Sequence, residues 1–169
     1  MMKADLQFDF IVGNDKSTLT IKREFEPRRK LVWDCYTRSE LPDRWFAPKP
    51  LTTKTKFMDF SVGGHWLYAM VEPNGTEYWG RTDYQTIQPI DNYTALDGFC
   101  DENGTLNAEL PRAQWDVTFF DRTAHTLVQT IVRYPSPEAL EQVMQMGMKD
   151  GLTSTLERLD ELLLALEPH

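Results

Sequence analysis

Few residues of this 169-residue sequence have the type and spacing that catalysis or metal binding requires. His65, His125 and His169 stand far apart, and none has a sequence neighbour that marks it as a general base. Cys35 and Cys100 form no Cys-x-x-Cys pair, which excludes a zinc or redox site of that kind. Patterns such as Gly-x-Ser-x-Gly, His-Glu-x-x-His and the glycine-rich phosphate loop are absent. We therefore predict no catalytic residue, no metal site and no cofactor.

Aromatic residues are the more abundant candidates for a functional site. The chain contains five Trp, six Tyr and nine Phe, together with seven Met. Large rings and adaptable methionine side chains suit a pocket that accepts apolar guests. The same residues also fill protein cores, so a pocket lining and a packed core both stay open as interpretations.

Alternating apolar residues predict antiparallel strands along most of the chain. Residues 6–12 and 17–25 alternate on either side of a Gly13-Asn14 turn and predict a β-hairpin. In its second strand Arg23 shares one face with Leu19, Ile21 and Phe25. Further strands are expected at 65–71, 76–88, 93–99, 106–110, 115–119 and 127–131.

Several single residues within the predicted strands suggest a specific structural or functional role. Gly80 lies inside a strand, which indicates a bulge or a close backbone approach. Gln129 and Arg133 would orient a ligand if their strand parity faced inward. Asp97, with Asp101 and Glu102 near a turn, is interpreted as part of a solvated loop.

Three helices are predicted. The first covers 27–37, and a short second helix begins at the N-cap Ser39 and passes through Trp45. The last is the most regular, because leucine and methionine recur every three or four residues over 136–166 after the N-cap Ser136.

Two glycines fall inside the predicted C-terminal helix. A glycine in a helix interior costs about 1 kcal/mol relative to alanine. Gly147 and Gly151 lie one turn apart, and we interpret the pair as a place where side-chain bulk is not wanted. If a cavity exists, these glycines would form its helical wall.

The element order predicts an α+β fold in which a curved antiparallel β-sheet wraps around a long C-terminal helix. Two short helices follow the first strands, and residues 1–169 form a single domain. Residues 1–15 supply an extra N-terminal strand that pairs with 17–25. That strand either adds to the sheet of one subunit or pairs across a homodimer, so a monomer or a homodimer is expected.

Charge and hydropathy exclude several classes of protein. The net charge of −8 argues against nucleic-acid binding. No apolar run is long enough to span a membrane, and the N-terminus lacks the pattern of a secretory signal, so a cytoplasmic location is expected. The first third of the chain is net positive and the remainder is strongly negative. This asymmetry either steers a protein partner or mixes on folding.

A set of motifs makes the chain resemble the START-like (SRPBCC, Bet v 1-type helix-grip) superfamily. Within it, the sequence is similar to the stand-alone bacterial form of the activator of heat-shock-protein-90 ATPase homologue group. The resemblance covers about 18–163, and His65 departs from it because relatives often carry Arg there. The motifs that carry it are Arg23-Glu24-Phe25 with Pro27, Val32-Trp33, Trp45-Phe46-Ala47-Pro48, Gly63-Gly64-His65-Trp66, Gly80, and Gly151-Leu152 before Leu156, Leu159 and Leu162.

The resemblance implies a cavity between the concave face of the sheet and the long helix. Aromatic residues of one parity on each strand would line this cavity, together with residues of the helices. The expected ligand-binding residues are Trp33, Trp45, Trp66, Tyr68, Met70, Tyr78, Trp115, Val117, Phe119, Met144, Gly147, Met148, Gly151 and Leu152.

Three functions follow as alternatives. The first is non-enzymatic binding of a small hydrophobic or aromatic ligand. The second is a co-chaperone-like interaction with a chaperone partner. It is supported by the resemblance and by the positive charge of the first third of the chain. The cations in question are Arg28, Arg29, Lys30, Lys54 and Lys56. The third is a cyclase- or hydrolase-type enzyme, which needs polar groups that converge inside the cavity.

Overall fold

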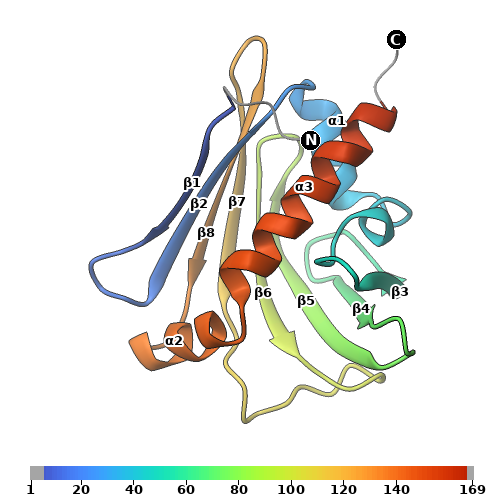
Figure 1. The fold of residues 1–169 in the computed structure, drawn as a ribbon, viewed down its shortest axis with the longest axis vertical. Helices are drawn as coiled ribbons and strands as arrows, with labels where there is room; N and C mark the ends of the chain where they lie inside the picture. The colour runs from blue at the N-terminus through green and yellow to red at the C-terminus, as the bar shows by residue number, and fades with distance from the viewer. Residues whose placement is uncertain (1–5, 167–169) are drawn as a thin grey trace.

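The computed structural model describes residues 6–166 and shows one eight-stranded antiparallel sheet with helices on its concave face (Figure 1). The strand order is β1-β2-β8-β7-β6-β5-β4-β3, so β1 and β3 form the two edges. The strands are β1 (Phe8–Val12), β2 (Thr18–Phe25), β3 (Thr52–Met58), β4 (His65–Val71), β5 (Glu77–Gln88), β6 (Asn92–Phe99), β7 (Gln114–Asp121) and β8 (Thr126–Arg133).

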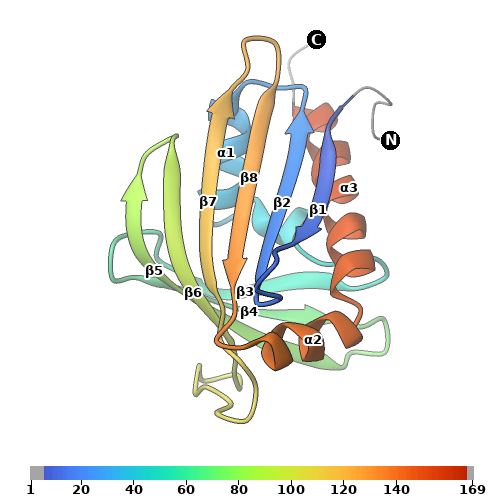
Figure 2. The same cartoon turned by 90° about the vertical axis from the view of Figure 1, so that its left-hand side faces the viewer.

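The helices are α1 (Arg29–Thr37), α2 (Pro137–Gln145) and α3 (Met148–Leu166), with a single 3₁₀ turn, η1, at Pro42–Arg44. Figure 2 shows that β3 and β4 run across the lower ends of the other strands, so the sheet is strongly curved and encloses the space in front of α3. This confirms the predicted α+β fold class. The N-terminal hairpin is also confirmed as β1 and β2; residues 1–5 of the predicted segment lie outside the described residues.

The prediction of one helix over 136–166 is wrong. Ser136 does cap the start, since its side chain accepts a hydrogen bond from the Ala139 amide at 3.1 Å. The helix then ends at Gln145, and Gly147 adopts a φ of +88° before α3 begins. A left-handed residue terminates a helix, and glycine adopts that conformation without steric cost. The spacing of apolar residues continues across the break, which is why periodicity did not reveal it.

Two further expectations are corrected. The second short helix is only η1, and Ser39 does not cap it, because the turn starts after Leu41 and the chain becomes irregular before Pro48. Residues 106–110 form no strand; Leu106 makes an isolated bridge to Cys100 and the chain then turns.

The main hydrophobic core lies between α1, α3 and the inner faces of β2, β7 and β8. The alternating side chains of β2 point into it: Leu19, Ile21, Arg23 and Phe25 are all at most 3% exposed. A second, smaller cluster of Trp66, Tyr84 and Ala95 lies under β4, β5 and β6. The space between these two clusters is where the structure is not filled.

Candidate functional site

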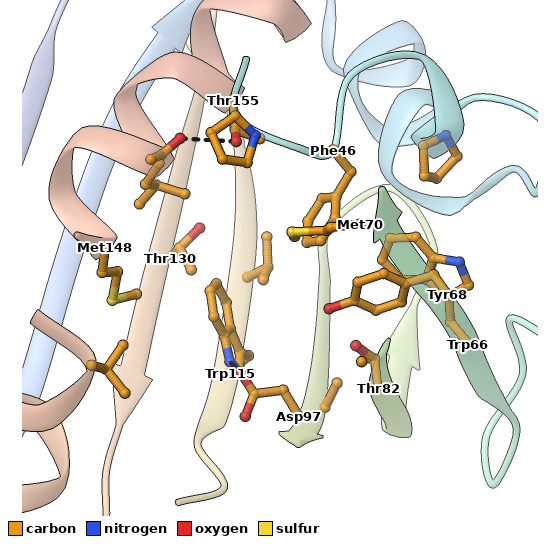
Figure 3. A pocket seen from close by; sticks show the side chains of 18 of the residues that line it. Phe46, Trp66, Tyr68, Met70, Thr82, Asp97, Trp115, Thr130, Met148 and Thr155 are labelled. Atoms are coloured by element: carbon orange, nitrogen blue, oxygen red, sulfur yellow. Dashed lines mark hydrogen bonds between the residues drawn. The ribbon is translucent and has the colours of Figure 1, made fainter. Parts of the chain in front are cut away.

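A cavity of about 380 Å³ lies between the concave face of the sheet, the segment around η1, and the start of α3. Figure 3 shows that side chains from β4, β5, β6, β7, β8 and α3 point into it. Its volume falls within the range typical of small-molecule sites. The lining includes eleven residues predicted for the ligand site: Trp45, Trp66, Tyr68, Met70, Tyr78, Trp115, Val117, Gly147, Met148, Gly151 and Leu152.

Three predicted residues lie elsewhere. Trp33 and Phe119 face each other within the packed core, with ring centroids 5.1 Å apart, and they are 6% and 1% exposed. Met144 is on α2, on the far side of the Gly147 break, where it packs against the core and lines a separate shallow depression with Val12. Had α2 and α3 been one helix, Met144 would lie on the same face as Met148.

The two glycines of the predicted helical wall do line the cavity, but neither is crowded. A Cβ at Gly147 would meet no atom within 4 Å, and a Cβ at Gly151 would lie 3.7 Å from Pro48. Gly147 is therefore explained by its left-handed backbone and not by a need for space.

Gly80 is the glycine that makes room in the cavity. A Cβ at this position would lie 2.7 Å from both Cζ and Oη of Tyr68, whose ring crosses Gly80 on the neighbouring strand. The prediction of a bulge or a close backbone approach at Gly80 is therefore wrong, because a side chain occupies the space and the strand register is regular there. The ring of Tyr68 also stacks on Trp66 with centroids 4.1 Å apart, and Phe46 contacts both edge to face. These three rings form one aromatic wall of the cavity.

Asp97 is the acidic residue of the cavity, and it corrects the prediction of a solvated loop. It lies in β6, one of its carboxylate oxygens accepts from the Ala113 amide at 2.8 Å, and the other accepts from Trp115 Nε1 at 2.7 Å. Burial raises the pKa of this carboxyl to about 6, against the opposing effects of those two donors and of Arg112. The carboxyl is held in place, yet each of its oxygens keeps a free lone pair.

Two hydroxyl groups share the cavity wall with Asp97. Thr82 pairs directly with Asp97 across β5 and β6, and Tyr68 pairs with Gly80 one strand further along. Since alternate residues of a strand face the same side, all three side chains lie on the concave face, and Figure 3 shows them pointing into the same part of the cavity. Neither hydroxyl makes a hydrogen bond to any residue within 6–166.

Arg23 also lines the cavity, and its Nη2 makes no hydrogen bond to any residue within 6–166. The residue is 1% exposed, its guanidinium lies 4.5 Å from the Phe25 ring, and Nη2 is 3.9 Å from Asp160 Oδ1 on α3. Burial lowers the pKa of the guanidinium, and Asp160 opposes that effect. A buried ion pair of this kind positions β2 against α3.

Sequence reasoning missed the polar residues because apolar residues carried the periodicity argument. Asp97 alternates with Ala95 and Phe99, and Thr82 alternates with Tyr84, so strand parity places both inward. The polar pair predicted on β8 faces the other way: Arg133 is exposed, and Thr130 lines the cavity with Val128. The inward parity of β8 is therefore opposite to the parity that Gln129 and Arg133 required.

The remaining candidates for chemistry are unpromising in the structure. Burial raises the pKa of the Cys35 thiol to about 12, which makes it unreactive near neutral pH. His65 lies beside the Phe57 ring on the opposite face of β4 from Trp66, His125 lies in the β7–β8 turn, and His169 is outside the described residues. Within residues 6–166 no group of His, Cys, Asp and Glu could hold a metal ion.

Several cations of the basic first third of the chain form ion pairs with acidic residues in the folded protein. Arg29 pairs with Asp91, Lys30 pairs with Asp34, and Lys54 pairs with Glu77. Lys56 donates to the Glu102 carbonyl at 2.7 Å.

Comparison with known proteins defines first a class and then a family. Solved structures of the same architecture include protein Ms6760 from Mycobacterium smegmatis, with 29% identity, a TM-score of 0.86 and coverage of 96% of this chain and 99% of that one. A protein from Arthrobacter aurescens gives 29% identity and a TM-score of 0.85 over 96% of each chain. A protein from Staphylococcus epidermidis gives 26% identity and a TM-score of 0.81, over 94% of this chain and 96% of that one. The fold is thus the helix-grip fold of the START-like class.

The family is identified by sequence. Residues 26–164 match the family described as Activator of Hsp90 ATPase homolog 1-like protein, and the chain belongs to that family. No curated protein matches the chain. None of the helices within residues 6–166 is long and apolar enough to cross a membrane.

Proposed function

We propose that this protein binds a small hydrophobic or aromatic ligand in the cavity between the sheet and α3. The observation that carries the proposal is the cavity itself: about 380 Å³ of space bounded by aromatic and methionine side chains. A domain of this size gains stability by filling its interior. Space on this scale beside a well-packed core is typical of a binding site.

The test is saturable binding of a neutral fluorescent apolar probe, N-phenyl-1-naphthylamine. The wild-type protein should bind one probe molecule, and native mass spectrometry of protein purified from cells should show a bound small molecule. Leu152→Trp fills the cavity from α3, and this variant should lose the probe. Leu164→Trp is the matched control because Leu164 is 42% exposed on the same helix. The absence of a saturable site in the wild type would refute the proposal.

One observation favours a second function, catalysis by proton transfer. Asp97 is a partly buried carboxyl that faces an aromatic cavity, and a carboxyl with a pKa near 6 is suited to take up and release a proton at neutral pH. The small molecule recovered from the protein would be incubated with wild-type protein and with Asp97→Asn. Catalysis predicts a new product mass with the wild type only, and an unchanged molecule in both samples contradicts it.

The co-chaperone alternative rests on the family description. Arg29, Lys30 and Lys54 already form surface ion pairs with acidic residues of the same chain. A pull-down with a heat-shock-protein-90 chaperone at low and at high salt tests it, and failure to bind at low salt would exclude an electrostatic contact.

A further inference from the structure

The cavity lining includes polar side chains on several elements, among them Thr130 and Thr155, and one group of three that forms a polar face. This polar face consists of Tyr68, Thr82 and Asp97, one residue from each of the neighbouring strands β4, β5 and β6. In Figure 3 the hydroxyls of Tyr68 and Thr82 turn toward the interior of the cavity, and the carboxyl of Asp97 lies beside them, turned toward Trp115. A cavity that selected only for hydrophobicity would gain nothing from three oxygens on one wall, since polar groups facing an apolar guest lose their hydration.

Asp97 supplies fixed acceptors. Its two oxygens are held by Ala113 and Trp115, at 2.8 and 2.7 Å, so the carboxyl cannot turn away from the cavity. Each oxygen can accept one more hydrogen bond. Both donors approach from β7 and the segment before it, which leaves the side toward β5 and the cavity for a ligand.

Tyr68 and Thr82 supply hydroxyl groups without partners. The Tyr68 ring is fixed by stacking on Trp66 and by the space above Gly80, so its hydroxyl is directed along the sheet toward β6. Burial and the nearby Asp97 raise the pKa of the Tyr68 phenol, which keeps it protonated and able to donate. Thr82 lies directly opposite Asp97 in the register, where paired side chains are about 5 Å apart.

From this arrangement we infer that the ligand is an aromatic molecule with a neutral hydroxyl group, and that Tyr68, Thr82 and Asp97 bind that hydroxyl. The inference rests on the proposed binding function. The ligand hydroxyl donates its proton to a carboxylate oxygen of Asp97 and accepts a hydrogen bond from Tyr68 or Thr82. A carboxylate ligand is disfavoured because it would meet the negative charge of Asp97.

The experiment measures displacement of N-phenyl-1-naphthylamine by three molecules of one shape: naphthalene, 2-naphthol and 2-naphthoate. We expect 2-naphthol to displace the probe at about one tenth of the naphthalene concentration, since a hydrogen bond to a charged group contributes on that scale. The acid, 2-naphthoate, should be the weakest of the three. Equal displacement by naphthalene and 2-naphthol, or strongest displacement by 2-naphthoate, would overturn the inference.

Three substitutions locate the preference. Tyr68→Phe, Thr82→Val and Asp97→Asn should each reduce the preference for 2-naphthol over naphthalene about threefold or more, while naphthalene itself binds as before. Tyr68→Phe keeps the stacked ring and Thr82→Val keeps the side-chain shape, so both variants should fold. Tyr84→Phe is the matched control, because Tyr84 lines the same cavity but is only 4% exposed.

The outcomes separate this inference from the proposed function. If the probe does not bind to the wild type, the binding function fails. If the probe binds and the three substitutions leave the preference unchanged, or Tyr84→Phe reduces it equally, the binding function stands and the assignment of the polar face is wrong.

Discussion

The two ends of the same sheet interior use aromatic residues in different ways. Under α1, Trp33 contacts Phe60, Tyr93 and Phe119 edge to face, with centroids 5.7, 6.1 and 5.1 Å apart, and Trp33 and Phe119 are both buried. Under the start of α3, Trp66 and Tyr68 stack on each other and present their edges and faces to a cavity.

The difference comes from what covers each end. The last turns of α3 and all of α1 lie on β2, β7 and β8, and their leucines reach the sheet. At the other end α3 begins with Met148 and Gly151, after a break at Gly147 that turns α2 aside, as Figure 1 shows. A helix that starts at this point leaves β4, β5 and β6 uncovered by a second layer. The cavity therefore results from the position at which α3 begins and not from the number of aromatic residues.

The largest expected effect contrasts the packed end with the surface beside it. Phe119→Ala should lower the free energy of unfolding by about 3–5 kcal/mol, because it opens a cavity among rings that already fit. Phe120→Ala is the control, since Phe120 is 42% exposed and should change stability by less than about 0.5 kcal/mol. Urea denaturation measures both. Similar losses of unfolding free energy for the two variants would show that the rings around Phe119 are not closely packed.

The second prediction concerns the pH dependence of the cavity end. The pKa of Asp97 is about 6 in the folded protein against an ordinary 3.8, because of burial. The folded state then holds more protons between pH 4 and 6, so its stability falls as pH rises through that range, by at most about 3 kcal/mol. Burial raises the pKa of the nearby Tyr68 and Tyr134 phenols, so neither changes charge in that range.

Asp97→Asn removes this titration. The free energy of unfolding of the wild type minus that of Asp97→Asn should decrease from pH 4 to pH 7 and be constant above. A difference that rises over this range would mean that the carboxylate is stabilised in the fold, and the carboxyl would then be no part of an apolar cavity.

The third prediction tests the close approach that shapes the aromatic wall. Gly80→Ala should cost about 1–3 kcal/mol and weaken binding of the neutral probe, because the new methyl group displaces the Tyr68 ring. In a Tyr68→Ala background the same substitution should cost much less, since the atoms it meets are gone. Equal costs in the two backgrounds, measured by urea denaturation, would rule out the contact.

The smallest effects distinguish two glycines that sequence reasoning treated alike. Gly147→Ala should destabilise the protein by about 1 kcal/mol because its φ is +88°. Gly151→Ala should stabilise it by up to about 1 kcal/mol, because Gly151 lies inside α3 and a Cβ would make an ordinary contact with Pro48. Thermal unfolding measures the sign of both stability changes. Destabilisation by Gly151→Ala would support the prediction that a side chain is not tolerated at this position.

The amino-acid sequence by itself determined most of the strands and most of the apolar lining. It did not predict β3, and it predicted a strand at 106–110 where only an isolated bridge forms. Alternation with period two depends only on neighbours along the chain, so the parity of Trp66, Tyr68 and Met70 could be read directly. The same rule applied to Thr82 and Asp97 would have placed them inward, because parity does not depend on polarity.

Only the tertiary structure decided which of these inward residues are packed and which border a cavity. Trp33 and Trp45 have the same residue type, yet Trp33 contacts three rings of the core and Trp45 lines the cavity. That outcome depends on where α3 starts, and its start depends on the backbone angle of one residue, Gly147. Apolar periodicity continues through that break. Local sequence therefore predicts which residues of each element face inward, but not where the interior is left unfilled.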